Sequence, residues 1–222
     1  MVKINPIKVL DTFAKESLKI QNNKTNYSKF SAKLSEIGDT FISTKQTDIF
    51  TKTTKRLAEK LVSTKKENLA GIIYSYLIKI NKNNEKILEE LATNALIIAK
   101  RQHDPLHIMA RTNDLKIIYQ HKPNNSTKLL KILYEEKRAL TEIVKKYESL
   151  SQSHISISRE LKPCEKYEEK LAAIKMEIGE LLIKQNEKSS AVTELEQALS
   201  IYKKIGIGEN AKKIENILNT LK

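Results

Sequence analysis

Apolar residues recur along this chain at three- and four-residue steps, with short polar breaks between them. The clearest stretch is Ala173–Ile207, in which two apolar stripes are joined by the polar residues 185–188. The first stripe contains Leu171, Ile174, Ile178, Leu181 and Leu182, and the second contains Ala191, Leu195, Ala198, Leu199 and Ile201. Residues with this spacing share one face of an α-helix. The stretch therefore predicts a hairpin of two amphipathic helices.

Small residues in this stretch indicate how the predicted hairpin packs. Gly179 lies inside the first helix, where glycine costs about 1 kcal/mol relative to alanine. We therefore expect another helix to cross at Gly179 at close range. Gly206 suits a left-handed residue that ends the second helix. Ser189 or Ser190 is expected to cap the start of that helix.

Three other parts of the chain resemble weaker copies of Ala173–Ile207. Residues 35–42 share Glu, Ile, Gly and a final Ile with residues 176–183. Residues 70–104 align with 173–207 without a gap, although Tyr76 stands in place of the glycine. A third copy begins at Pro105, and the copies recur every ~38–40 residues. The longer step to the last copy predicts an inserted loop from Ser149 to Leu161, with the last repeat starting at Pro163.

Local start signals complete the predicted organisation. Asn5-Pro6 and Asp104-Pro105 each predict an N-cap followed by proline in the first helical turn. Thr64 and Glu67 have the capping-box spacing and predict a helix that starts at Lys65. The predicted units are an N-terminal helix within 1–26 and a repeat domain over 27–222, with hairpins at about 27–63, 64–104, 105–149 and 163–206 and a capping helix at 209–221.

The spacing of small residues resembles the tetratricopeptide repeat family. In that family a small residue in helix A is followed by alanines about twelve and nineteen residues later, and here these positions are Gly179, Ala191 and Ala198. The family's aromatic residue near the start and its closing proline are absent. The resemblance implies an all-α fold, an α-solenoid of about four antiparallel helical hairpins with flanking N- and C-terminal helices. The small number of glycines and prolines, five and four, also favours an all-α class.

Members of this family usually bind a peptide or partner protein in the concave groove lined by helix A of each repeat. The resemblance thus implies a non-enzymatic interaction module or adaptor. Aligning the copies on Gly38, Tyr76, Lys116 and Gly179 puts Ser35, Ile73, Asn113 and Met176 at one position of the family's carboxylate clamp, and Asp39, Leu77, Ile117 and Glu180 at the other. Only Asn113 suits a clamp, so the groove is expected to favour a basic or apolar peptide. The candidate contact residues are Ser35, Asp39, Asn113, Glu180 and Lys184.

The charge of the chain adds an alternative function. Forty lysines and arginines face 27 acidic residues, a formal net charge of +13. Such an excess attracts phosphate or an anionic membrane surface. However, the excess is almost all lysine, it is mixed with acids, and a composition rich in Lys, Asn and Ile is typical of an AT-rich genome. Solvated helix faces are the preferred interpretation. The alternative is RNA or DNA binding through Lys100, Arg101, Lys137, Arg138, Lys145 and Lys146, with a further cluster at Lys52, Lys55 and Arg56.

No catalytic or metal-binding constellation is evident in the sequence. His103 and His107 have a spacing that suits two metal ligands, but the helix start at Pro105 falls between them. Cys164 lies near a predicted helix start beside Lys162 and Lys166, which would lower the pKa of its thiol. No histidine partner is marked, so a structural or solvent-facing cysteine is preferred to an enzyme that uses this thiol. We predict no enzymatic activity, no cofactor and no metal.

The sequence contains no segment typical of export or of membrane insertion. Residues 1–18 lack the apolar run of a signal peptide, and no stretch approaches the ~20 apolar residues that span a bilayer. A single cysteine excludes an internal disulfide. The default expectation is a cytoplasmic protein without a membrane span.

Overall fold

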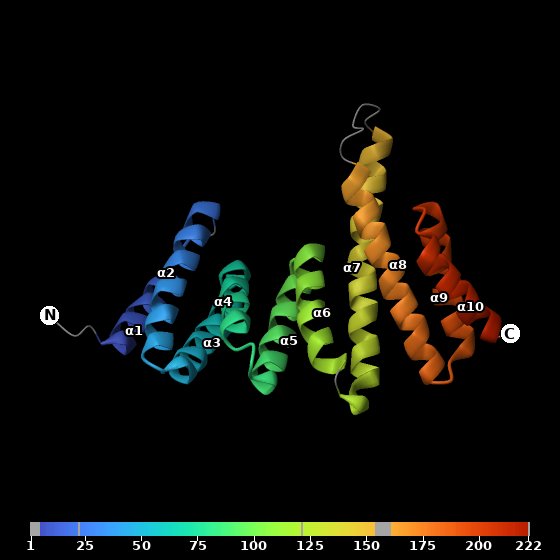
Figure 1. Ribbon diagram of the computed structural model, residues 1–222. Helices are drawn as coiled ribbons and strands as arrows, with labels where there is room; N and C mark the ends of the chain where they lie inside the picture. Colours follow the sequence, from blue (N-terminus) through green and yellow to red (C-terminus); the bar gives the residue numbers. More distant parts are fainter. Residues whose placement is uncertain (1–4, 22, 121, 154–160, 222) are drawn as a thin grey trace. The chain divides into compact units, whose positions relative to one another are not determined.

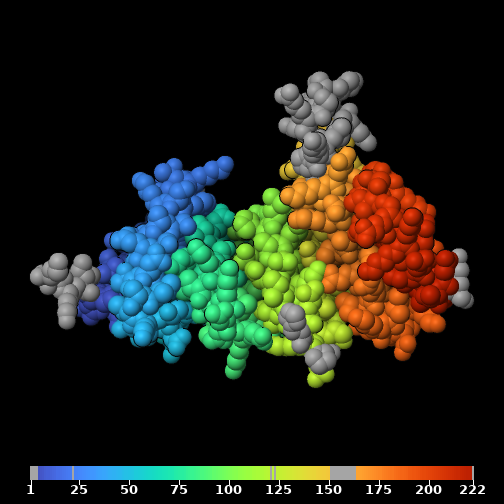
Figure 2. Space-filling model, in the orientation of Figure 1, coloured from blue at the N-terminus to red at the C-terminus, as the bar shows by residue number. Residues whose placement is uncertain are grey.

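The computed structural model describes residues 5–21, 23–120, 122–153 and 161–221. Over these residues the regular structure is α-helical apart from one short 3-10 helix, so the predicted all-α class is confirmed (Figure 1). The chain divides into two compact units, residues 1–101 and 102–222. Within each unit, successive helices lie against one another on the face that Figure 2 shows.

The first unit is a stack of helices in chain order. Its described helices are α1 (Pro6–Ser17), α2 (Lys24–Ser43), α3 (Thr47–Ser63), α4 (Glu67–Ile80) and α5 (Glu85–Arg101). Each helix packs on the next, and in addition α1 packs on α3 and α2 packs on α4. Contacts between alternate helices are typical of stacked hairpins, the α-solenoid arrangement. The predicted separation of the first 26 residues from a repeat domain stays a prediction.

The second unit follows the same principle with longer helices in its middle. Its described elements are α6 (Pro105–Gln120), a 3-10 helix (Pro123–Asn125), α7 (Ser126–Ser153), α8 (Leu161–Lys184), α9 (Lys188–Lys204) and α10 (Gly208–Leu221). Each α-helix packs on the next one in sequence. Ala211 and Ile214 of α10 join Leu195, Ala198 and Tyr202 of α9 in one buried cluster. The final helix therefore covers the apolar face of the last hairpin, as predicted.

Four turns between helices share one hydrogen-bond pattern. The N–H groups of Gln46, Lys66, Glu187 and Ile207 donate to the carbonyls of Phe41, Leu61, Leu182 and Tyr202, five residues earlier in each case, at 2.8, 2.8, 2.9 and 3.0 Å. The residue before each donor is left-handed, with φ of 57° at Lys45, 59° at Lys65, 63° at Asn186 and 78° at Gly206. This is the Schellman motif. Gly206 was predicted in this role, whereas the other three positions lack glycine.

Those turns correct two predicted helix starts. Thr64 does not cap α4: its hydroxyl donates to the Lys60 carbonyl at 3.0 Å and so belongs to the end of α3. With Lys65 left-handed, α4 begins only at Glu67. Similarly, α9 begins at Lys188 without a side-chain cap, so Ser189 and Ser190 lie inside the helix.

Polar caps confirm other predicted starts. Asn5 Oδ1 accepts from the Ile7 N–H at 3.0 Å, and Asp104 Oδ1 accepts from the N–H groups of Leu106 and His107 at 3.1 Å. Asn23 caps α2 in the same way, accepting from the Asn26 N–H at 2.9 Å. As a result α2 begins at Lys24 and not at the predicted Tyr27.

The predicted loop from Ser149 to Leu161 is wrong at both ends. Helix α7 continues to Ser153, and α8 begins at Leu161, two residues before the predicted start at Pro163. The part of the predicted loop between these helices, residues 154–160, lies outside the described residues.

Two glycines mark close helix crossings, as the sequence predicts. A Cβ added at Gly179 would lie 2.7 Å from Leu195 Cγ and 3.4 Å from the Ala191 carbonyl oxygen, so α9 crosses α8 at this point. A Cβ at Gly38 would lie 2.2 Å from the Tyr76 hydroxyl oxygen, which reaches α2 from α4. Gly71 of α4 differs, because its nearest neighbour would be Ile98 Cγ2 at 3.9 Å.

Substitution by alanine is expected to have opposite effects on stability at Gly179 and at Gly71. Gly179→Ala is expected to lower the free energy of unfolding by about 1–3 kcal/mol, because overpacking against Leu195 exceeds the gain in helix propensity. Gly71→Ala, the matched control, is expected to raise it by about 0.5–1 kcal/mol. Urea unfolding followed by circular dichroism measures both. Equal stabilisation by the two substitutions would contradict the close crossing at Gly179.

The left-handed lysines yield a second prediction. Lys65→Gly is expected to stabilise the protein by about 0.5–1 kcal/mol, because a left-handed conformation costs an L-residue roughly 1–2 kcal/mol and costs glycine little. Lys52→Gly, at an exposed position inside α3, is expected to destabilise by about 1 kcal/mol. The same unfolding assay compares the two variants, and a loss of stability in both would exclude strain at Lys65.

Candidate functional site

In the first unit, Tyr76 brings two predicted contact residues together. Its hydroxyl lies 3.3 Å from Asp39 Oδ1 and 3.4 Å from the Ser35 carbonyl oxygen, and donates toward both. Gly38 between them makes room for the ring. Burial and the Asp39 carboxylate raise the pKa of Tyr76. Ser35 and Asp39 thus lie on the α2 face that meets α4, and Asp39 already accepts a hydrogen bond.

The alignment that placed Ile73 and Leu77 at groove positions is wrong for α4. Both side chains have no exposed surface and form part of the core of the first unit. Helix α4 therefore offers no contact residue at either position. The alignment failed because it matched Tyr76 to a glycine, whereas Tyr76 contacts the glycine of the preceding copy.

In the second unit, the predicted contact residues have separate surroundings. Asn113 is exposed on α6, and Lys184 is the exposed last residue of α8. Glu180 of α8 forms an ion pair with Lys213 of α10 at 3.5 Å. Beside them Glu177 pairs with Lys116 of α6 and accepts from Gln120 Nε2 at 3.1 Å. Glu180, the acid expected at the groove in this unit, and the nearby Glu177 are therefore already partnered by basic side chains.

Ion pairs also join α7, α8 and α9 at two levels. Glu194 of α9 lies 2.5 Å from Lys137 Nζ of α7 and 3.6 Å from Lys175 Nζ of α8. At the other level, with the signs reversed, Lys204 of α9 lies 3.5 Å from Glu148 of α7 and 2.5 Å from Glu168 of α8. Glu194 and Glu168 are only 7% and 6% exposed.

Some of the predicted nucleic-acid-binding residues have acidic partners within the protein. Lys137 contacts Glu194 and also lies over the Tyr134 ring at 4.6 Å, so its charge stabilises the packing of helices. Arg101 lies 3.4 Å from Glu67. Lys100 is exposed, as are Arg138, Lys145 and Lys146 of α7. The last three make no ion pair within the described part of the chain.

Cys164 and His107, the candidate reactive and metal-binding residues, have surroundings typical of structural residues. Cys164 is buried, and desolvation followed by the nearby Glu168 and Glu148 carboxylates raises the pKa of its thiol. The expected lowering of this pKa is therefore wrong. His107 Nδ1 lies 2.6 Å from Asp104 Oδ2 at the start of α6. Within the described residues, no group of three or more His, Cys, Asp or Glu side chains is arranged to hold a metal ion.

None of the described helices combines the length and the apolar character that are needed to cross a bilayer.

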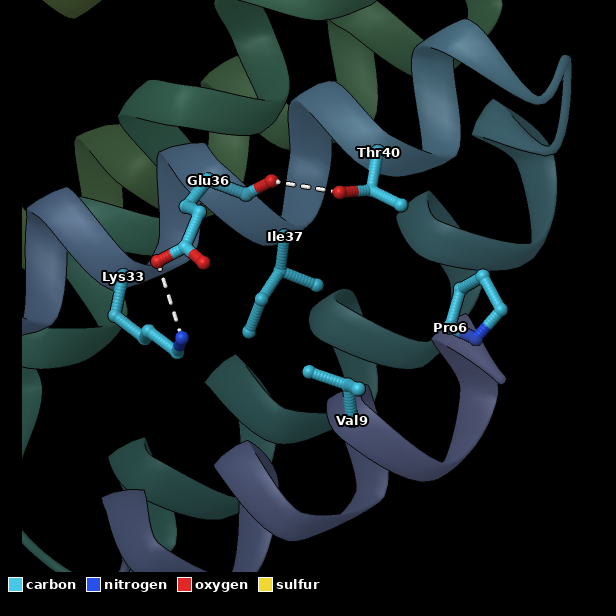
Figure 3. Close-up of a pocket in the computed structure, with 6 residues that line it drawn as sticks. All are labelled: Pro6, Val9, Lys33, Glu36, Ile37 and Thr40. Carbon is cyan, nitrogen blue, oxygen red and sulfur yellow. Dashed lines mark hydrogen bonds and ion pairs between the residues drawn. The ribbon is translucent and has the colours of Figure 1, made fainter. Parts of the chain in front are cut away.

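A groove lies between α1 and α2 in the first unit, and we call it the α1–α2 groove. Its first hollow, of about 250 Å³, lies between Pro6 and Val9 of α1 and Ile37 and Thr40 of α2. Val9 and Ile37 point toward one another across it, and Lys33 pairs with Glu36 at 3.0 Å on its rim (Figure 3).

The second hollow, of about 490 Å³, shares Lys33 with the first. Its apolar lining includes Phe13 and Phe30, whose rings stack with centroids 5.0 Å apart. Its rim carries Lys19, Lys29 and Lys33 and one acid, Glu16. No local pattern predicted this groove, because the helical period of α1 and α2 shows which face is apolar but not how completely a neighbour covers it.

Comparisons with known proteins find matches only among solved structures. No protein-family model matches the sequence, and no curated protein matches it. Among solved structures, the "DHF119 filament" is 16% identical over 98% of this chain and 95% of that chain, with a TM-score of 0.26. The de novo designed helical repeat protein DHR64 is 16% identical over 98% and 96%, with a TM-score of 0.29. A circular tandem repeat protein is 14% identical over 97% of this chain and 46% of its own length, with a TM-score of 0.26. These TM-scores are too low to support a structural relationship. The packing of helices within each unit supports the fold assignment.

A buried carboxyl in the second unit yields a pH prediction. Glu136 of α7 is 9% exposed, and burial, with Glu177 opposing the nearby Lys116, raises its pKa above the ordinary 4.5. A raised pKa in the folded state means that stability falls as pH rises from 4.5 through the higher folded-state value.

Glu136→Gln removes this titration while keeping the shape of the side chain. We expect the variant to be more stable than the wild type at pH 7.5, with the difference shrinking toward pH 4.5. Urea unfolding at several pH values measures it. Glu142→Gln, at an exposed position on the same helix, is the control and should give curves parallel to the wild type. A wild-type advantage at pH 7.5 would mean that the Glu136 charge is stabilising.

Proposed function

We propose that this protein is a non-enzymatic interaction module that binds a helical segment of a partner protein in the α1–α2 groove. The observation that carries the proposal is the groove itself, two adjoining hollows with apolar side chains inside and charged side chains on the rim. Concave, partly apolar surfaces of this kind are where amphipathic helices dock. The stacked helical hairpins of each unit, which resemble tetratricopeptide repeats in their spacing of small residues, support the same class of function.

The position of the groove on α2 supports a helix as its occupant. Lys33, Glu36 and Thr40, three and four residues apart, share the face that borders the groove. Ser35 and Asp39 share another face, which meets Tyr76 of α4. Helix α2 thus packs on α4 along one side and borders the groove along the other. A bound helix would contact α2 much as α4 does.

The charges on the rim define the chemistry of the partner. Lys19 and Lys29 are exposed and make no ion pair within the described residues. Residues 1–101 hold 19 lysines and arginines against 10 acidic residues, a formal net charge of +9. An amphipathic helix with acidic residues beside its apolar face complements this surface.

The surface implied by the tetratricopeptide resemblance is the competing site. It would use Ser35, Asp39, Asn113, Glu180 and Lys184 and would favour a basic or apolar peptide. Asp39 and Glu180 already bind Tyr76 and Lys213, so a peptide would have to displace internal partners. For this reason we favour the α1–α2 groove.

Peptide selection on the full chain tests the proposal. A display library of random helical peptides is screened for binding to the full chain. The affinity of the enriched peptides is then measured by fluorescence anisotropy. We expect acidic amphipathic peptides, and an affinity loss of about tenfold in the variant Lys29→Glu/Lys33→Glu, because two attractive contacts become repulsive.

The control variant Lys79→Glu/Lys86→Glu makes the same change of charge at exposed positions of α4 and α5 and should change the affinity less than about twofold. Enrichment of basic peptides whose binding is lost in Asp39→Lys would move the site to the α2–α4 face. A library without any enriched peptide would overturn the proposed module.

A further inference from the structure

A row of cations runs along the outer face of α3. Lys52, Arg56 and Lys60 are four residues apart, and all three are exposed. They lie opposite the buried positions of the helix, which include Phe50, Thr54, Leu57 and Leu61. We call these three residues the α3 ridge. Four helical residues rise about 6 Å, so the three charges form a nearly straight line.

The surroundings of the α3 ridge are also basic. Lys45 and Lys65, in the turns before and after α3, are exposed. Residues 44–66 contain seven lysines and arginines and two acids, Asp48 and Glu59. Glu59 lies 3.9 Å from Lys55, and Asp48 lies in the first turn of α3, where a negative charge favours the helix N-terminus.

The ridge cations differ from many other lysines of the protein in having no acidic partner. Within the described residues, none of Lys52, Arg56 and Lys60 makes an ion pair, and the same holds for Lys45 and Lys65. By contrast, Lys55 pairs with Glu90, and Lys66 donates to the carbonyls of Leu18 and Ile20 at the end of α1, at 2.6 and 2.7 Å. Lys55 and Lys66 thus stabilise the fold, whereas the ridge itself is available to a ligand.

We propose that the α3 ridge binds the phosphate backbone of a nucleic acid. Its cations follow one line along the helix, about 6 Å apart, and can therefore contact successive phosphates along one strand. Arg56 adds a forked donor that suits a phosphate oxygen pair. No aromatic side chain belongs to the ridge, so it offers charge contacts without base stacking. Binding is therefore independent of sequence.

The apolar content of the α3 face argues against a membrane as the ligand. Ile49, 44% exposed, is the large apolar residue that this face presents. Helices that lie in a bilayer interface insert a broad apolar face, and α3 buries its apolar face in the unit. The inference is also independent of the proposed peptide site, because none of the ridge residues lines the α1–α2 groove.

Binding to labelled oligonucleotides tests the proposal. Anisotropy titrations of the full chain with a single-stranded and a duplex oligonucleotide, at salt concentrations from about 50 to 300 mM, give the affinity and its salt slope. The variant Lys52→Gln/Arg56→Gln/Lys60→Gln is expected to lose at least tenfold in affinity at the lowest salt. Its slope of log K against log salt should be shallower by about 2–3, one phosphate contact for each lost cation.

A matched variant distinguishes binding at the α3 ridge from general attraction by the positive net charge. Lys24→Gln/Lys79→Gln/Lys86→Gln removes three charges at positions that are also exposed and without an ion pair in the described chain. It should lose threefold or less. Equal losses in both variants would overturn the ridge in favour of diffuse attraction, and so would a wild type that shows no salt-dependent binding.

Sedimentation with phosphatidylserine vesicles tests whether the α3 ridge binds an anionic membrane surface instead. Ridge-dependent binding to vesicles without binding to oligonucleotides would replace the nucleic acid by a membrane surface. Circular dichroism of all variants verifies that they are folded.

Discussion

The structure depends on how closely neighbouring helices approach one another. At Gly179 the absence of a side chain lets Leu195 of α9 reach the backbone of α8, and at Gly38 it lets Tyr76 of α4 reach the backbone of α2. The hairpin turns support the same geometry, because the carbonyls of Phe41, Leu61, Leu182 and Tyr202 accept the closing hydrogen bonds while their side chains are buried. The α8–α9 hairpin is thus held by a turn at one end and a close crossing along its length, whereas in the first unit the close crossing joins α2 to α4.

Lysine has two distinct uses in this protein. In the second unit it joins helices, as Lys137 and Lys175 do with Glu194, and Lys204 does with Glu168 and Glu148. In the first unit a larger share of the positive charge stays exposed, above all along α3. An ion pair that is largely buried constrains helix position, whereas an exposed unpaired cation contributes little to stability and much to the attraction of anions. The same composition therefore supports both packing and binding.

The proposed binding surfaces follow from this separation. The α1–α2 groove combines apolar lining with a basic rim, which suits an acidic amphipathic helix. The α3 ridge has regular charge and little apolar surface, which suits a phosphate backbone. Both lie on the first unit. The buried Cys164 and the His107–Asp104 pair have surroundings that explain them as parts of the fold.

Local sequence patterns predicted the all-α class, the caps at Asn5 and Asp104, the left-handed Gly206 and the close crossing at Gly179. These features depend on residues near one another in the chain, so periodicity and local hydrogen bonding reveal them. The packing of the helices determines that Ile73 and Leu77 are buried and that Lys137 is an internal partner of Glu194. The partners involved are distant in sequence, 41 residues apart for Tyr76 and Ser35 and 57 for Lys137 and Glu194. No local pattern encodes which side chains of two helices meet, because that choice is made when their faces pack.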